Sequence, residues 1–298
     1  MTATTASWRL IPQRRFALSA RWRNPVGIAG AIIVGFVILT ALLGRFIWTT
    51  DPDNPAWTRL QAPSWAHPFG TDDLGRDTLA RVIHGAQVSL YVGAIAVGIS
   101  LCAGLVIGLV SAFYRGIVDL ILMRLVDIVF AFPLLVLAIL IVGLLGPSRR
   151  NAMIAIGIVY APAFARVIRA AALEVLGFPF IESARSLGAN DLRIITRHIL
   201  PNIVAPLIVL TTVYFSQAIL GEAFLSFLGL GTQPPEAAWG NMLSTARNFI
   251  ESSVWMSVFP GLAIMFAVLG FNFLGDGLRD VLDPRLGGVA DEIVVKSK

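Results

Sequence analysis

Three carboxylates stand close together in a polar stretch of this chain. Asp72, Asp73 and Asp77 fall between two long apolar runs. Carboxylate oxygens are the ligands that hard cations such as Ca²⁺ take in proteins, so one interpretation is a metal site. Solvated or paired carboxylates are commoner than metal ligands, and the neighbouring residues offer a second interpretation.

The second interpretation is a tight turn that leads into a helix. Gly70 and Gly75 permit backbone conformations that other residues avoid. Asp77 can cap a helix that begins at Thr78, and Arg76 can pair with an aspartate a few residues before it. In this reading the carboxylates are structural and carry no catalytic chemistry.

Glu222 is the carboxylate that lies deepest in an apolar run, since Asp127, Glu174 and Asp276 fall near the ends of such runs. A membrane carboxylate of this kind can mark an ion-coupled secondary transporter. A helix that starts at Ile203 rises about 28 Å before it reaches Glu222. The sequence therefore favours a residue near the outer boundary, bonded to neighbouring helices, over a proton-coupling site.

The scarce residue types exclude several chemistries. The only lysines are Lys296 and Lys298, so a phosphate-cradling loop that ends in Gly-Lys-Ser/Thr cannot form. Cys102 is the sole cysteine, which excludes intramolecular disulfides, thiolate zinc sites and iron–sulfur clusters held by several cysteines. We expect Cys102 to pack within a membrane span. The histidines lie outside the apolar runs, and we expect surface or interfacial positions for all of them: His67, His84 and His198.

The net charge of +5 does not indicate nucleic acid, because the cations are scattered at the ends of apolar runs. Lipid headgroups are the simpler partner. Near the N-terminus, Trp8, Phe16 and Trp22 among arginines suggest an amphipathic element on the inner leaflet. Pro12 interrupts this pattern, so a disordered tail is an equal alternative.

Composition predicts an integral membrane protein of the all-α class. Of 298 residues, 56% are hydrophobic and only 14% are charged. A helix needs roughly 20 apolar residues to cross a bilayer, and six stretches qualify. The first is too long for a cleaved signal peptide and should remain as an anchor. The predicted spans are 26–48, 88–113, 121–145, 152–172, 203–230 and 254–275.

The distribution of cations predicts the orientation. Six spans place both termini on one side, together with residues 114–124 and 173–202, and that side collects 16 of the 23 Lys and Arg residues. Positive residues favour the cytoplasmic side, so both termini should be cytoplasmic. Arg149 and Arg150 are an unusual pair on the outer side.

Helix contacts and breaks are also predicted. Ala94, Gly98, Gly104 and Gly108 form a small-residue pattern that lets the second span pack closely against another helix. Two further prolines, Pro133 and Pro162, should kink the third and fourth spans.

A polar segment between the fourth and fifth spans has the pattern of two short helices. Apolar residues recur at helical spacing up to Leu187, and Gly188 stands where helices commonly end in the left-handed conformation. Asn190 can cap a second helix over 191–200, which Pro201 should close. The segment is either a projection for another protein or a simple interfacial loop.

This segment resembles a family signature. Glu182, Ser183, Ala184 and Gly188, followed by Ile199-Leu200-Pro201-Asn202, resemble the EAA loop of membrane subunits of bacterial ABC importers. In that family the loop is a coupling helix that docks into a cleft of the ATPase subunit. Ser183 replaces the usual alanine, a change between small residues. The resemblance implies these coupling residues: Glu182, Ser183, Ala184, Arg185, Leu187 and Gly188.

Other motifs narrow the resemblance to the C-type permease of dipeptide, oligopeptide and nickel importers. The outer-loop motif runs from His67 to Asp77, with Ala80 and Gln87 departing from the serine and arginine often found there. Three further runs resemble that permease family: 222–231, Trp239-Gly240 and 275–285. The outer-loop residues carried over are Gly70, Thr71, Asp72, Asp73, Gly75, Arg76 and Asp77.

The resemblance implies a multi-pass permease in the bacterial inner membrane that is not itself an enzyme and holds no cofactor. Its implied partners are a second homologous permease, two ATPase subunits that bind ATP and Mg, an extracytoplasmic binding protein and membrane lipids. Dipeptides or oligopeptides are the leading cargo, with nickel chelates, glutathione or oligosaccharides as alternatives. The expected division is a cytoplasmic segment (1–25), a permease domain (26–275) with an outer loop (49–87) and a coupling loop (173–202), and a cytoplasmic tail (276–298).

Overall fold

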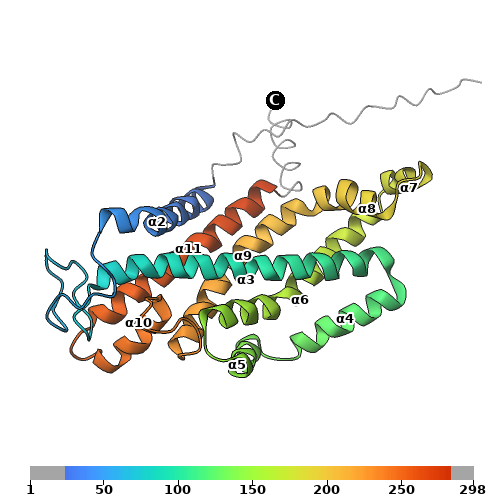
Figure 1. Cartoon of the computed structure of the whole chain (residues 1–298). Coiled ribbons are helices and arrows are strands. Elements are labelled where there is room, and N and C mark those ends of the chain that lie inside the picture. Colours follow the sequence, from blue (N-terminus) through green and yellow to red (C-terminus); the bar gives the residue numbers. More distant parts are fainter. Residues whose placement is uncertain (1–23, 283–298) are drawn as a thin grey trace, which may run out of the picture.

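The computed structural model describes residues 24–282, which form a helical bundle (Figure 1). Within this range no β-strand occurs, and Thr71 and Asp77 form an isolated bridge. The all-α prediction is confirmed. The helices are α2 (Pro25–Ile47), α3 (Thr78–Tyr114), α4 (Gly116–Phe130), α5 (Leu134–Leu145), α6 (Arg149–Leu176), α7 (Pro179–Ser186), α8 (Asp191–Ile194), the π-helical η1 (Ile195–Ile199), α9 (Leu200–Phe227), α10 (Trp239–Ala246), the 3₁₀ η2 (Arg247–Phe249) and α11 (Trp255–Leu282).

Side-chain caps set the starts of several long helices. Asp77 accepts a hydrogen bond from the Ala80 amide at 2.7 Å, so the predicted cap of α3 is confirmed. Asn24 and Ser148 cap α2 and α6 in the same way. These side chains satisfy amides that a helix start otherwise leaves without a partner.

Between residues 24 and 282, five helical stretches are long and apolar enough to cross a membrane. A sixth is reached when α4 and α5, which meet at 90°, are counted together as one broken span. The predicted single span over 121–145 is therefore wrong in shape, because it begins at Gly116 and breaks at 131–133. Pro133 lacks an amide hydrogen and disfavours helical backbone at the residue before it, so it stands just ahead of α5. At Pro162, by contrast, α6 continues as one helix.

Close packing of α3 on α6 forms the middle of the bundle. A Cβ at Gly104 would lie 2.3 Å from Phe164 Cβ, and one at Gly108 would lie 2.6 Å from the Ala165 carbonyl oxygen. Only half of the predicted small-residue face packs, because Ala94 is exposed and nothing lies within 4 Å of a Cβ at Gly98. The two pairs are six residues apart, which places them on different faces of the helix.

Two predictions about single side chains are wrong. Cys102 is exposed on α3 in this chain, away from the face that packs on α6. His67 is buried, with its ring edge against Trp57 and a ring nitrogen 3.2 Å from Ser64 Oγ. His84 and His198 are half-buried, as interfacial residues should be.

The prediction that Pro201 closes a helix is also wrong. The chain stays helical from Asp191 through α8, η1 and α9 to Phe227. The π-helical turn at 195–199 ends two residues before Pro201, and its wider backbone accommodates a residue that cannot donate to the preceding turn.

Some predictions lie outside the described residues. They include the amphipathic element with Trp8, Phe16 and Trp22, most of the 1–25 segment, and the end of the motif over 275–285. The tail over 276–298 is described only as far as Leu282, where α11 ends.

Candidate coupling and outer-loop sites

The predicted coupling residues lie in α7 and in the turn that follows it. Pro179 occupies the first position of α7, and Gly188 adopts φ +79° just beyond its end. Asn190 accepts a hydrogen bond from the Arg193 amide at 2.9 Å and so starts α8. Figure 1 shows α7 and α8 at one extremity of the bundle, opposite the loop that joins α2 to α3. The first short helix and the left-handed glycine are confirmed, whereas the second helix does not end near residue 200 but runs on into α9.

Two buried isoleucines hold this helix pair to the bundle. Ile181 of α7 and Ile194 of α8 belong to the same hydrophobic core as Val175 at the end of α6. The Arg185 guanidinium stacks over the Phe113 ring at 5.5 Å, which ties α7 to the end of α3. The projection is therefore packed against two long helices, as a rigid element should be.

The outward side of the same projection is exposed and mixed in character. Leu187 is 88% exposed and Leu192 is 69% exposed. Ala184 is half-buried, while the remaining predicted residues are exposed: Glu182, Ser183, Arg185 and Gly188. Exposed apolar side chains beside charges and small residues are typical of protein interfaces.

The outer-loop motif forms a compact turn at the other end of the bundle. Thr71 donates a hydrogen bond to the Thr58 carbonyl oxygen at 2.7 Å. Gly70 and Gly75 have φ of +72° and +86°, and a Cβ at Gly75 would lie 2.1 Å from the Trp57 carbonyl oxygen. Both glycines are needed by the backbone, as the turn interpretation predicts.

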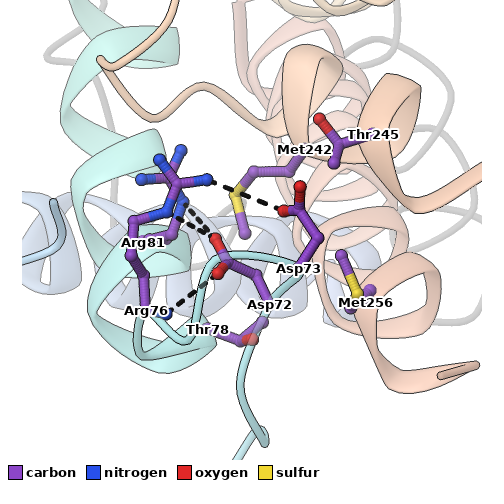
Figure 2. A pocket seen from close by; sticks show the side chains of 8 residues that line it. All are labelled: Asp72, Asp73, Arg76, Thr78, Arg81, Met242, Thr245 and Met256. Atoms are coloured by element: carbon purple, nitrogen blue, oxygen red, sulfur yellow. Dashed lines mark hydrogen bonds and ion pairs between the residues drawn. The ribbon is translucent and has the colours of Figure 1, made fainter. Parts of the chain in front are cut away.

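Two arginines neutralise Asp72 in this turn (Figure 2). Arg76 Nε donates to Asp72 Oδ2 at 2.7 Å, and Arg81 Nε lies 3.6 Å from the same oxygen. Arg76 Nη2 lies 3.9 Å from Asp73 Oδ1. The cavity between them is about 20 Å³, which is the size of a single water.

This geometry supports the turn and not the metal interpretation. Within the described residues, no group of three His, Cys, Asp or Glu side chains is placed to hold a metal ion. Asp77 serves as the helix cap, and the Trp48 indole also donates to its Oδ1, at 3.3 Å. Burial raises the pKa of Asp77 above its ordinary value of 3.8, although these hydrogen bonds oppose the rise.

The motif is joined to distant segments by contacts that sequence spacing alone does not reveal. Arg81 is buried and donates to Asp53 Oδ1 at 3.0 Å and to the Pro235 carbonyl oxygen at 3.4 Å. Trp255 Nε1 donates to the Thr71 carbonyl oxygen at 3.2 Å. At the same end, Arg149 forms an ion pair with Glu236. Arg149 thus lies beside the α9–α10 loop, where the six-span prediction places it.

Glu222 is fully buried in α9 and is surrounded by hydroxyls. It accepts hydrogen bonds from Ser226 at 2.6 Å, from Thr232 at 3.3 Å and from Ser89 of α3 at 3.5 Å. The interpretation of a residue bonded to neighbouring helices is confirmed.

Fold and sites together define a multi-pass helical membrane protein with an exposed helical projection at one end. The chain matches the model of the family described as "Binding-protein-dependent transport system inner membrane component" over residues 104–288, more than half its length. Residues 21–63 match "N-terminal TM domain of oligopeptide transport permease C". This chain belongs to the binding-protein-dependent transport system inner membrane components, as the resemblance predicts. It is therefore a transporter subunit of the inner membrane and not an enzyme.

Several curated relatives are similar in sequence to this chain over almost its whole length. The "Dipeptide transport system permease protein" of Alkalihalophilus pseudofirmus is 44% identical and covers 92% of this chain and 93% of that protein. The "Di/tripeptide transport system permease protein" of Pseudomonas aeruginosa is 43% identical, with 90% of each covered. The "Glutathione transport system permease protein" of Pectobacterium atrosepticum is 42% identical, covering 89% and 88%.

A solved structure shares the fold. It is titled "Inward facing conformations of the MetNI methionine ABC transporter", with a TM-score of 0.56 and 19% identity. The match covers 68% of this chain and 96% of that one. At this identity the likeness concerns the fold alone.

Proposed function

We propose that this chain is one of two homologous permeases that together form the pathway of an ATP-driven importer for dipeptides or oligopeptides. The relatives whose names specify dipeptides and di/tripeptides support this cargo, since they align with 90% or more of the chain. Glutathione is itself a tripeptide, so the glutathione relative fits the same class. Nickel chelates and oligosaccharides are alternative cargo of the same transporter type.

The projection formed by α7 and α8 is the observation that carries the coupling part of this proposal. In our proposal it docks into a cleft of an ATPase subunit through Glu182, Ser183, Ala184, Arg185, Leu187 and Gly188. Two such subunits bind ATP and Mg, and this chain holds neither. Residues 173–202, the segments 1–25 and 276–298, and both termini then face the cytoplasm.

A mechanical route leads from this projection into the membrane. The helix is continuous from α8 through η1 to α9, so a displacement that α7 passes through the Gly188 turn to α8 is transmitted along one helix to a membrane span. When ATP closes the ATPase pair, the projections move with their clefts and the spans rearrange to alternate access. The outer loop 49–87, with its Asp72, Arg76 and Arg81 contacts, serves as a scaffold beside the docked binding protein.

The decisive variant is Gly188→Val. A β-branched residue at φ +79° costs about 1–3 kcal/mol of strain, and nothing lies within 4 Å of a Cβ there, so the effect is on the backbone alone. We expect ATP hydrolysis in the assembled transporter to persist while peptide uptake falls roughly tenfold. The measurement is hydrolysis and uptake in the same proteoliposomes.

Gly177→Val is the matched control, since Gly177 ends α6 with φ −83°, a conformation open to any residue. Normal uptake by Gly188→Val at normal expression contradicts the coupling role. Affinity purification with the genomic neighbours tests the assembly itself. An ATPase and a second permease should co-purify, with hydrolysis stimulated by liganded binding protein, whereas transport by the chain alone contradicts the importer.

A further inference from the structure

An ion pair joins α4 to α6 on an exposed face of the bundle. Arg166 Nη2 of α6 donates to Asp127 Oδ1 of α4 at 2.6 Å. The two side chains are 50% and 52% exposed in this chain. The Arg166 guanidinium also lies over the Phe130 ring, 4.2 Å from its centroid.

The surface around this pair is mainly apolar, although Arg124 of α4 is also exposed, one helical turn before Asp127. Asp127 lies eleven residues beyond Gly116, the first residue of α4, or about 17 Å along the helix. Exposed apolar side chains continue from the start of α4 past the pair and along α5, and those on α4 and α5 include Ile117, Leu120, Ile121, Ile128, Leu135 and Leu140. The pair is therefore set inside an apolar belt, where lipid is a costly neighbour for half-exposed charges.

The backbone beside the pair supplies a second, independent observation. Residues 131–133 are not helical and are exposed, and the chain turns by 90° across them. Open backbone at membrane depth is stable where protein covers it or where it lines water. Phe130 links the break to the ion pair, since it ends α4 and carries the Arg166 guanidinium on its ring.

A second ion pair between α4 and α6 has the geometry expected of a purely structural contact. Arg169 donates from Nε and Nη2 to both oxygens of Asp119, at 2.6 and 2.5 Å. Ser111 of α3 donates to the same carboxylate, and the pair is less exposed than Asp127 and Arg166. Within residues 24–282, Arg166 makes one side-chain hydrogen bond, from Nη2. Arg169 commits two nitrogens to Asp119, so Arg166 keeps more of its donors, and a more exposed side chain, for a ligand.

We infer that Asp127 and Arg166 line the aqueous translocation pathway and bind the charged ends of a passing peptide. The Arg166 guanidinium takes the α-carboxylate, for which its planar fork is suited, and the Asp127 carboxylate takes the α-ammonium. The peptide replaces one ion pair with two, so both protein charges stay neutralised during passage. This role rests on the proposed peptide cargo, whereas the aqueous position of the pair does not.

The first experiment measures uptake by the complete transporter in proteoliposomes with its binding protein. The probes are alanyl-leucine, its N-acetyl derivative and its C-terminal amide, and each variant is compared with wild type for the same probe. The quantity compared is the ratio of variant uptake to wild-type uptake for one probe. Both measurements use the same binding protein, so its preference among the three probes cancels. Asp127→Asn should lower uptake of the two probes with a free amino group by roughly fivefold, the size of one partly screened ion pair, and spare the acetylated probe.

Arg166→Gln should show the complementary pattern, with loss for the two probes that carry a free carboxylate. Asp119→Asn is the matched control, because it breaks the structural tie between the same helices and should affect all probes equally. Equal loss of all probes in Asp127→Asn and Arg166→Gln overturns the peptide contact. Failure of wild type to import alanyl-leucine counts against the dipeptide part of the proposed cargo instead.

The second experiment needs no cargo. In a Cys102→Ser background, Phe132→Cys of the assembled transporter is treated with a charged, water-soluble methanethiosulfonate. Phe36→Cys is the control, because Phe36 is even more exposed than Phe132 in this chain, at 69% against 47%, but lies on the continuous helix α2. Phe132→Cys should react about tenfold faster or more, since the reactive thiolate forms in water. Equal, slow labelling of both variants overturns the aqueous position of the pair.

Discussion

Single buried residues tie the outer-loop end of this chain to segments that are far apart in sequence. Arg81 joins the start of α3 to Asp53 and to Pro235. Glu222 joins α9 to Ser89 of α3 and to Thr232. A buried charge without partners is costly, so each of these side chains restricts the arrangements that the surrounding segments can adopt.

Glu222 is predicted to be a structural acceptor. Glu222→Ala removes the acceptor of three hydroxyls and should lower the free energy of unfolding by about 2–4 kcal/mol, seen as a lower apparent Tm in detergent. Glu222→Gln keeps an oxygen in place and should retain peptide uptake. An ion-coupled carrier requires a titrating carboxylate, so full folding with abolished transport in Glu222→Gln revives that alternative.

Asp77 gives a prediction for pH. Its pKa is raised by burial above 3.8, so the stability that its protonated form contributes is present below that pH and is lost as the pH rises through the folded-state pKa. Asp77→Asn keeps the cap and stays neutral. The difference in apparent Tm between Asp77→Asn and wild type should therefore shift in favour of the variant as the pH rises from about 4. A constant difference across this range contradicts the burial argument.

Asp77→Ala separates capping from charge. This variant removes the acceptor for the Ala80 amide and should be about 1–2 kcal/mol less stable than Asp77→Asn at any pH, since neither variant titrates at this position.

At the scale of elements, the sequence predicts the features that are determined within a single segment, such as the position and the ends of a helix. Apolar runs give α2, α3, α6, α9 and α11, and the Asp77, Gly188 and Asn190 signals give the ends of helices. The sequence does not predict what depends on two segments. The break at Pro133 is predicted by the sequence, but its angle of 90° depends on where α5 packs, and the burial of His67 depends on Trp57.

The candidate coupling residues follow the same rule. Helical spacing and the left-handed glycine give the shape of the projection. The Arg185 contact with Phe113 requires the end of α3, more than 70 residues earlier, and no local pattern reports it. The sequence shows Asp127 and Arg166 only as two opposite charges in different apolar runs. That they form an ion pair is visible only in the folded structure.

The contact between α3 and α6 yields a prediction for elements. Gly104→Ala places a Cβ 2.3 Å from Phe164 Cβ, so the helices must separate, at a cost of about 1–3 kcal/mol. Gly98→Ala on the same helix meets nothing within 4 Å and should be neutral or slightly stabilising. Apparent Tm in detergent compares the two variants. Equal effects contradict the structure of this interface.

Over the whole molecule, the two ends differ in a way that suits transmission of motion. The end that holds the 48–77 loop and α10 contains a buried cluster of paired charges, Asp72, Arg76 and Arg81, while the end that holds α7 presents exposed Leu187 and Leu192 (Figure 1). The longest helix, α3, packs on α6 along the bundle and connects the two ends. A force applied at α7 therefore acts on a body that is stiff at its far end.

Orientation in the membrane is the remaining prediction at this scale. The bias of 16 of 23 cations toward one side places the α7 end in the cytoplasm and the 48–77 loop outside. In a Cys102→Ser background, Trp65→Cys should react with a membrane-impermeant maleimide in intact cells, because Trp65 is fully exposed in that loop. Leu187→Cys should react only after the cells are opened. The opposite pattern places α7 where no ATPase can reach it, and it contradicts both the orientation and the coupling role.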